Sequence, residues 1–287
     1  MSNSFANQHA LVTGAGSGIG RATALLLGQL GASLTLCDRN PVALQETTDM
    51  LTIKGTRVDQ EIVDVSDWAA MQALAERVHA RHGTLDVLVN NAGVGTAGPF
   101  LDTPIEDWQW VMGINLMGVV HGCKAFGARM AADKRGHIVN IASAAGYYAA
   151  PDMSAYSASK HAVMGLTESL RLEMAVHGVG VSAICPGVIN TNIVAATRMH
   201  GSTAKSQDKL VAIYQKRNYG PEHVAEAVVS AITCPGVSSA WLRDIRLNSA
   251  KSMRQPFPPC GPAGFNKGFA TLVDRAEAEL TAPRAPA

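Results

Sequence analysis

This sequence of 287 residues lacks several features that identify particular classes of protein. Lysine and arginine number 24 against 23 aspartate and glutamate residues, so a net charge of +1 offers no attraction for nucleic acid or an acidic membrane. The N-terminal stretch MSNSFANQHA has no basic segment followed by an apolar one, and no uncharged apolar run approaches the roughly 20 residues of a membrane span. We therefore expect a cytoplasmic protein that binds a small-molecule substrate, with no nucleic acid and no membrane as partner.

The cysteines also lack a pattern. None of the five stands in a CxxC pair, which argues against a structural zinc site and against a disulfide framework. We interpret most of them as buried small apolar residues. They are Cys37, Cys123, Cys185, Cys234 and Cys260.

The sequence does contain a regular alternation of short apolar runs and longer stretches of helical period. The apolar runs are nearly continuous, as expected of strands covered by helices on both faces. The pattern predicts an α/β fold, a Rossmann-like doubly wound parallel sheet of about seven strands with helices on both faces. The runs include HALVT (9–13), SLTLC (33–37), LDVLV (85–89), GHIVNIA (136–142) and VGVSAI (179–184).

Length and composition indicate one domain. With 47% hydrophobic and 16% charged residues, the chain can bury one large core. We predict a single domain over residues 1–249, including a substrate loop at about 190–220, and a C-terminal extension over 250–287. The extension contains RQPFPPCGPAGFNKG (254–268), which breaks all periodicity.

The first predicted strand runs into the glycine-rich stretch TGAGSGIGRA. Such a turn lets backbone N–H groups approach a pyrophosphate at the positive end of the following helix. The fingerprint GxGxxG fails here, and TGxxxGxG remains. A turn that only packs strand against helix stays open as an alternative for this stretch alone. The candidate cofactor contacts in it are Gly14, Ser17, Gly18 and Ile19.

An acidic residue follows the second predicted strand. Asp38 lies 18 positions after Gly20, near the ~20-residue offset at which a carboxylate meets the adenosine ribose. A carboxylate there can accept hydrogen bonds from both ribose hydroxyls and repels the extra phosphate of NADP. Arg39 carries a charge that softens this repulsion. We predict NAD as the cofactor, with NADP less favoured.

Two later strand ends carry residues suited to the same ligand. VDVSD places Asp64 and Val65 where they would flank an adenine ring. VNNAG places Asn91, Ala92 and Gly93 at the carboxyl end of a central strand, where open α/β sheets bind ligands. A capped turn is the alternative for the asparagine, and the two roles are compatible. We predict that these five residues contact the dinucleotide.

The stretch YSASK places Tyr156 four residues before Lys160. On a helix the two side chains share one face, so the ammonium can lower the phenol pKa from its usual value of about 10. Tyr156 is therefore predicted as the acid/base. Ser143 ends a predicted strand, and its hydroxyl can reach the carbonyl oxygen that Tyr156 protonates. Tyr147 and Tyr148 have no lysine at i+4 and are expected to line the substrate cavity.

Taken together, these motifs resemble the short-chain dehydrogenase/reductase family over roughly residues 8–235. The resemblance implies that Ser143 orients and polarises the carbonyl, Tyr156 transfers the proton, and Lys160 binds the nicotinamide ribose and acidifies Tyr156. It also implies that Asn115 holds a water in a proton relay, although local bonding inside a helix is the alternative for this residue alone. The motifs are TGAGSGIG, Asp38, NNAG, Asn115 in GINLMG, Ser143, YxxxK and PGVINT.

The resemblance carries further expectations. It implies no metal, and it implies a homo-oligomer, either a tetramer or a dimer, formed through the apolar helices around GVVHGCKAFGARM and SKHAVMGLTESLRLEMAV. Many members end in a glycine-rich apolar strand, where this chain has SSAWLRDIRLN (238–248). It also implies that the loop after CPG binds the nicotinamide carboxamide through Pro186, Gly187, Ile189 and Thr191.

Residues 190–220 correspond to the segment that covers the substrate in relatives. Their apolar side chains indicate a cavity for a medium or bulky hydrophobic alcohol. The alternative, in which the same side chains only pack against the sheet, stays open. The candidate substrate contacts are Val94, Ser143, Tyr147, Tyr148, Met153, Tyr156 and Ile193.

The predicted function is that of an NAD-dependent oxidoreductase, which moves a hydride between a secondary alcohol or ketone and nicotinamide. The alternative is a non-catalytic dinucleotide-binding sensor or interaction protein, which would keep the glycine turn but could lose the tyrosine or the lysine. An epimerase or dehydratase shares YxxxK but would normally have a GxxGxxG turn and a larger C-terminal substrate domain. The sequence has neither of these features.

Overall fold

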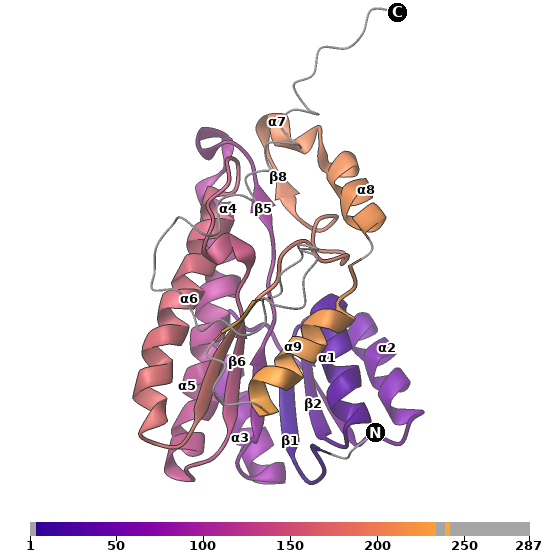
Figure 1. Cartoon of the computed structure of the whole chain (residues 1–287), viewed down its shortest axis with the longest axis vertical. Coiled ribbons are helices and arrows are strands. Elements are labelled where there is room, and N and C mark those ends of the chain that lie inside the picture. The colour runs from indigo at the N-terminus through magenta and orange to yellow at the C-terminus, as the bar shows by residue number, and fades with distance from the viewer. Residues whose placement is uncertain (1–3, 218, 234–238, 242–287) are drawn as a thin grey trace, which may run out of the picture. The chain divides into compact units, whose positions relative to one another are not determined.

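A seven-stranded parallel sheet forms the centre of the protein, in a computed structural model that describes residues 4–217, 219–233 and 239–241 (Figure 1). Its order is β3-β2-β1-β4-β6-β7-β9, and this arrangement confirms the predicted doubly wound fold. The predicted extension over 250–287 lies outside the described residues. The strands are β1 His9–Thr13, β2 Ser33–Asp38, β3 Val58–Ile62, β4 Val87–Asn90, β6 His137–Ile141, β7 Gly180–Cys185 and β9 Ser239–Trp241.

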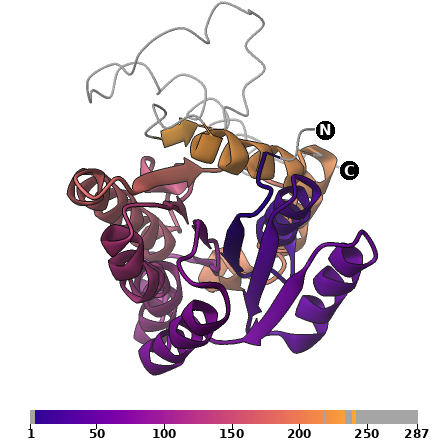
Figure 2. The same ribbon diagram turned by 90° about the horizontal axis from the view of Figure 1, so that it is seen from below.

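Helices cover both faces of the sheet. Helices α3, α5 and α6 bury side chains against one face, and α1, α2 and α9 against the other (Figure 2). A π-helical turn, Gly113–Met117, joins α4 to α5, and the two-residue strands β5 Thr96–Ala97 and β8 Arg198–Met199 form a separate pair. The helices are α1 Gly18–Gln29, α2 Pro41–Thr52, α3 Trp68–His82, α4 Ile105–Met112, α5 Gly118–Ala132, α6 Ser154–Ala175, α7 Gly201–Ala204, α8 Gln207–Arg217 and α9 Glu222–Thr233.

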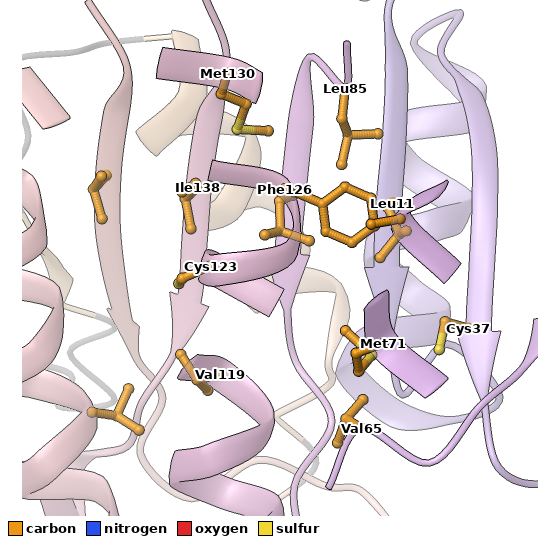
Figure 3. Close-up of a cluster of buried hydrophobic side chains, with 14 of the residues drawn as sticks. Leu11, Cys37, Val65, Met71, Leu85, Val119, Cys123, Phe126, Met130 and Ile138 are labelled. Atoms are coloured by element: carbon orange, nitrogen blue, oxygen red, sulfur yellow. The ribbon is translucent and has the colours of Figure 1, made fainter. Parts of the chain in front are cut away.

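The strands are continuously apolar because both of their faces are covered. Leu11 of β1 packs with the α3, α5 and α6 layer, whereas its neighbour Val12 packs with the α1, α2 and α9 layer. Phe126 of α5 lies among Leu11, Leu85 and Ile138 in the first of these cores (Figure 3). A separate hydrophobic core therefore lies on each face of the sheet, and the two cores together hold the strands in place.

The cysteines in the described part of the chain are free and buried. Cys37 and Cys123 belong to the core that contains Phe126, and Cys185 ends β7. Cys234 and Cys260 lie outside the described residues.

The order of the strands places a ligand site at one edge of the sheet. The chain runs outward from β1 through β2 to β3 and then crosses to β4 on the other side of β1. Ligands bind at such a switch point, outside the carboxyl ends of the strands. Within the described residues, no helix combines the length and the apolar character that crossing a membrane requires.

Candidate functional site

The glycine turn after β1 is fastened to the loop after β4. The side-chain amide of Asn91 donates to the carbonyl oxygens of Thr13 and Gly14, over 2.9 and 3.2 Å. In return, the Thr13 hydroxyl accepts the backbone N–H groups of Asn91 and Ala92. Gly14 has a φ of +64°, and a Cβ there would lie 2.8 Å from the Cα of Ala92. Only glycine fits this close approach of two backbones.

The start of α1 faces the loop after β7. A Cβ on Gly18 would lie 3.3 Å from Cγ2 of Thr191, so these two predicted cofactor contacts are neighbours. Ser17 makes no side-chain hydrogen bond to the helix start, which leaves the first N–H groups of α1 for an anion. The side chain of Ile189 is buried in the core, so a cofactor contact there would come from its backbone.

The loop after β7 also joins the loop after β6. The carbonyl of Pro186 accepts the backbone N–H of Ala144 over 2.8 Å, next to Ser143. The cofactor side of the predicted site is thereby connected to the catalytic side.

Asp38 ends β2, and both of its carboxylate oxygens are engaged. Oδ2 accepts the backbone N–H of Gly16, and Oδ1 accepts that of Asn40, both over 2.9 Å. Each oxygen keeps a second lone pair for a ribose hydroxyl. Arg39 is exposed beside it. The carboxylate is therefore held in one orientation at the edge where the predicted ribose would lie.

A second arginine near this turn was not predicted to belong to the site. The Arg21 guanidinium donates to the carbonyl of Gly16 over 2.5 Å and to the hydroxyl of Thr47 over 2.9 Å. It also pairs with Glu46 over 2.7 Å. Arg21 thus ties the glycine turn to α2. Its position directly after TGAGSGIG is the signal that could have identified it.

The predicted adenine contacts lie in the loop that follows β3. The carboxylate of exposed Asp64 accepts hydrogen bonds from the backbone and hydroxyl of Ser66. Val65 is buried in the core (Figure 3), and its carbonyl accepts a hydrogen bond from Nδ1 of His121 over 2.8 Å. These contacts hold the loop in place, with Val65 in the core and Asp64 at the surface.

The structure brings Tyr156, Lys160 and Ser143 together. Helix α6 carries Tyr156 and Lys160 one turn apart, and Ser143 hydrogen-bonds to Tyr156 from the end of β6. Lys160 is only 4% exposed, and its Nζ donates to the carbonyl of Ile141 over 2.9 Å. The same Nζ lies 5.9 Å from the centroid of the Tyr156 ring. The helical spacing predicted from YSASK is therefore present.

The pKa of Tyr156 differs from the expectation. Burial raises it to about 12, the hydrogen bond with Ser143 partly opposes this, and nearby Tyr214 raises it further. Burial also lowers the pKa of Lys160, to about 8. Burial is the largest influence on the phenol, and the Lys160 ammonium near the ring donates to the Ile141 carbonyl, so acidification of Tyr156 by Lys160 stays a prediction. The phenol is thus a proton donor at neutral pH.

Asn115 is fully buried in the π-helical turn. Its Oδ1 accepts the backbone N–H of Val94 over 2.8 Å, and its Nδ2 donates to the Val94 carbonyl and to the hydroxyl of Ser159. A Cβ on Gly93 would lie 3.3 Å from this Oδ1 and 3.6 Å from Nζ of Lys160. Asn115 therefore positions the loop after β4 beside the catalytic lysine.

The sequence comparison identifies the family to which these residues belong. A family model described as short chain dehydrogenase matches residues 8–201. The chain belongs to the short-chain dehydrogenase family. This confirms the resemblance, and the family is one of oxidoreductases that bind NAD or NADP.

Individual relatives agree with this membership. The probable oxidoreductase EphD of Mycobacterium tuberculosis is 45% identical over 231 residues, which make up 77% of this chain and 38% of EphD. The chain thus spans less than half the length of that relative. A short-chain dehydrogenase/reductase from Burkholderia phymatum, solved with NAD, has a TM-score of 0.79 at 34% identity and covers 90% of this chain and 99% of its own. A metagenomic short-chain oxidoreductase solved with NADP has a TM-score of 0.70 at 33% identity, over 83% and 97%.

Around the predicted catalytic residues of this short-chain dehydrogenase, the predicted substrate contacts differ in their surroundings. The Tyr147 hydroxyl hydrogen-bonds to the buried thiol of Cys185, and the ring packs against the core. Burial raises the pKa of Tyr148. The carbonyl of Ile193 accepts the hydroxyl of Thr197 over 2.7 Å. The side chain of Tyr147 thus also contributes contacts to the core.

Two further substrate contacts were predicted. Met153 precedes α6 and Val94 is held by Asn115, so both lie in loops next to the predicted catalytic residues. Tyr214 of α8 belongs to the apolar segment that was expected to cover the substrate, and it raises the pKa of Tyr156.

Proposed function

We propose that this short-chain dehydrogenase moves a hydride between NAD and a hydrophobic secondary alcohol or ketone. The observation that carries the proposal is the grouping of Tyr156, Ser143 and Lys160 beside the switch point of the sheet. A non-catalytic binding protein has no need to keep a buried lysine and a hydrogen-bonded serine around one tyrosine.

The residues at the switch point suit a dinucleotide. The turn at Gly14 leaves no room for a Cβ, and the N–H groups at the start of α1 are available for a pyrophosphate. The adenosine ribose would lie at Asp38, and the nicotinamide end at Gly187, Thr191 and Lys160. Bound NAD would supply or accept the hydride.

The chain's own residues handle the proton. The Ser143 hydroxyl and the Tyr156 phenol hydrogen-bond to each other, so both are placed to hydrogen-bond the same carbonyl oxygen of a substrate. Because its pKa is high, Tyr156 is protonated at neutral pH and gives its proton to the oxygen as a ketone is reduced. Buried Lys160 would stabilise the phenolate that forms, and Asn115 would hold the water that returns the proton.

The preference for NAD over NADP is part of the proposal. It rests on the carboxylate of Asp38, whose two hydrogen bonds to backbone N–H groups keep it from turning away. A 2′-phosphate at this position would meet a fixed negative charge. Arg39 is exposed, so solvent screens its charge and it offsets this repulsion only in part.

We also propose a homo-oligomer that forms through α5 and α6. Leu172 of α6 and Val176, which directly follows this helix, are 66% and 80% exposed, which is unusual for large apolar side chains so close together. Light scattering at micromolar concentration should show a dimer or a tetramer, and a monomer would contradict the proposal.

A further proposal is that the enzyme domain ends at about residue 249.

The test of the reaction is a set of initial rates. Purified protein is assayed with aliphatic, cyclic and aromatic secondary alcohols and their ketones, using NAD(H) and NADP(H) in parallel. We expect turnover with NAD(H), and a loss of ~10²–10⁴-fold in kcat for Tyr156→Phe with NADH binding retained. Tyr148→Phe is the matched control and should lose far less.

Three outcomes would count against the proposal. Turnover that survives Tyr156→Phe would remove the proton donor. Faster turnover with NADP(H) would remove the cofactor preference. NADH binding without turnover of any member of the panel would favour a dinucleotide-binding protein without catalysis.

A further inference from the structure

The substrate segment, residues 190–217, is fastened to α4 through one buried carboxylate. Asp107 of α4 is 6% exposed. Its Oδ1 accepts a hydrogen bond from Nη1 of Arg198, and its Oδ2 accepts one from Nε2 of His200, both over 2.6 Å. The Arg198 guanidinium also lies 3.7 Å from the ring centroid of Trp110, on the same helix. Two side chains of the substrate segment therefore converge on one helix.

Asp107 is ionised in this cluster. Burial alone would raise the pKa of its carboxyl group, but the hydrogen bonds from Arg198 and His200 outweigh burial and lower it. A buried carboxylate with two such partners is a strong tie, because removing a partner leaves a buried charge uncompensated.

The backbone contacts around this tie are few. Strand β8 pairs with β5 over only two residues, Thr96 with Arg198 and Ala97 with Met199. A pair of strands this short has little stability of its own. The hydroxyl of Thr203 adds one hydrogen bond, to the carboxylate of Asp152 over 2.6 Å. The side chain of Asp107 is therefore the main anchor for β8.

The anchor reaches the catalytic tyrosine through α8. The side-chain amide of Gln207, the first residue of α8, donates to the carbonyls of Val194, Ala195 and Thr197, each over 3.2 Å. These bonds join α8 to the stretch that precedes β8. Tyr214 is on α8 and interacts with Tyr156. The position of β8 therefore influences which side chains surround Tyr156.

We infer that Asp107 is a positioning residue for substrate binding, which holds the substrate segment beside Tyr156 through Arg198 and His200. The part of this inference that concerns substrate rests on the proposed function. Asp107 itself lies outside the catalytic group and acts through the segment. Its loss should loosen the segment and weaken substrate binding, while the proton-transfer group stays intact.

The test compares two buried carboxylates in the full chain. Asp107→Asn keeps the shape of the side chain and removes the charge. Glu61→Gln is the matched control, because Glu61 on β3 is 8% exposed and accepts hydrogen bonds from Arg77 and Arg81, away from the substrate segment. Amide hydrogen exchange and steady-state kinetics are measured on both variants and on the wild type.

For Asp107→Asn we expect amides in 196–214 to exchange at least ~10-fold faster, KM to rise ~10-fold and kcat to stay within ~3-fold. Glu61→Gln should lower the melting temperature and leave both readouts unchanged. Arg198→Met should reproduce part of the effect, and it replaces Asp107→Asn if that variant does not fold.

Exchange and KM in Asp107→Asn that match those of Glu61→Gln would overturn the inference, and so would a large loss of kcat at unchanged KM. The exchange readout needs no substrate. Faster exchange without any turnover in the wild type would therefore keep the anchor and reject the proposed reaction.

Discussion

The two halves of the candidate site are held together in different ways. The cofactor half is fixed by uncharged hydrogen bonds between side chains and backbone, in which Thr13, Gly14 and Asn91 join two neighbouring strand ends over about 3 Å. The substrate half is fixed by side-chain charge, in which Arg198 and His200 meet Asp107, a residue 91 and 93 positions away. The close approach at Gly14 leaves no room for a Cβ, whereas the charge cluster lies outside the main sheet. We therefore expect the cofactor half to tolerate fewer substitutions than the substrate half.

The largest effect is expected from breaking the cofactor half at Gly14. Gly14→Ala forces a Cβ onto Ala92 and a side chain onto a φ of +64°, so NAD binding should weaken by ~100-fold or more. Titration of NADH fluorescence measures this. Gly55→Ala is the control, since its φ of +79° carries similar strain but its Cβ would meet open space. Equal losses of NADH binding in both variants would show that strain alone is responsible.

Lowering the pH should reduce the stability of the whole fold, and with it both halves of the site, through two buried histidines that belong to neither half. Burial lowers the pKa of His9 and of His137 to about 4, and nearby His82 contributes to the shift at His9. The folded protein then binds fewer protons than the unfolded chain between pH 6.5 and 4, so stability falls as the pH falls through this window. Each histidine should contribute about 1–3 kcal/mol to the loss.

Urea unfolding at pH 7 and pH 5 measures this loss. His137→Gln should reduce the dependence of stability on pH. It removes the buried ring that hydrogen-bonds to Ser182, and glutamine does not titrate. A pH dependence that is unchanged in His137→Gln and in His9→Gln would contradict the prediction.

A smaller effect would sharpen the comparison inside the cofactor half. Asp38→Asn removes the fixed charge, so the ratio of NADP to NAD affinity should rise about 10-fold. Asp64→Asn serves as the control, because this carboxylate also follows a strand but is engaged by Ser66 at the surface. Competition between the two dinucleotides reports the ratio, and a ratio that shifts equally in both variants would remove Asp38 as its cause.

The smallest effect is expected for the brace behind the glycine turn. Arg21→Gln loses the hydrogen bond to the Gly16 carbonyl and the ion pair with Glu46, so NAD affinity should fall about 3-fold. Glu46→Gln breaks only the partly exposed ion pair and should change affinity by less. If Glu46→Gln lowers NAD affinity as much as Arg21→Gln or more, the hydrogen bond from Arg21 to the Gly16 carbonyl contributes nothing to NAD binding.

Much of the cofactor half could be predicted from the sequence because its contacts are local. A glycine turn follows a strand within a few residues, and the spacing of Tyr156 and Lys160 sets their common helical face. The hydrogen bond from Nζ to Ile141 and the burial that raises the pKa of Tyr156 both depend on how β6 packs against α6. Periodicity along one segment carries no such information.

The contacts of the substrate half could not be predicted from the sequence, because they join segments that lie far apart along the chain. Nothing in IEDWQWVM marks Asp107 as the partner of Arg198, because the two meet only after the chain has built two more strands of the main sheet. The hydrogen bond between Tyr147 and Cys185 likewise joins a loop to a strand that comes later in the chain. The sequence predicted only that Tyr147 lines a cavity, and it contained no signal for this hydrogen bond.

The π-helical turn at Gly113–Met117 makes the length of the chain here a functional constraint. Each residue advances an α-helix by about 100°, so the wider turn sets the angular phase between α4 and α5. With this phase, Asn115 faces Val94 while Val119 and Phe126 face the sheet. Deleting one residue between 113 and 117 would rotate one of the two groups out of place. This stretch should therefore accept substitutions far more readily than any change in its number of residues.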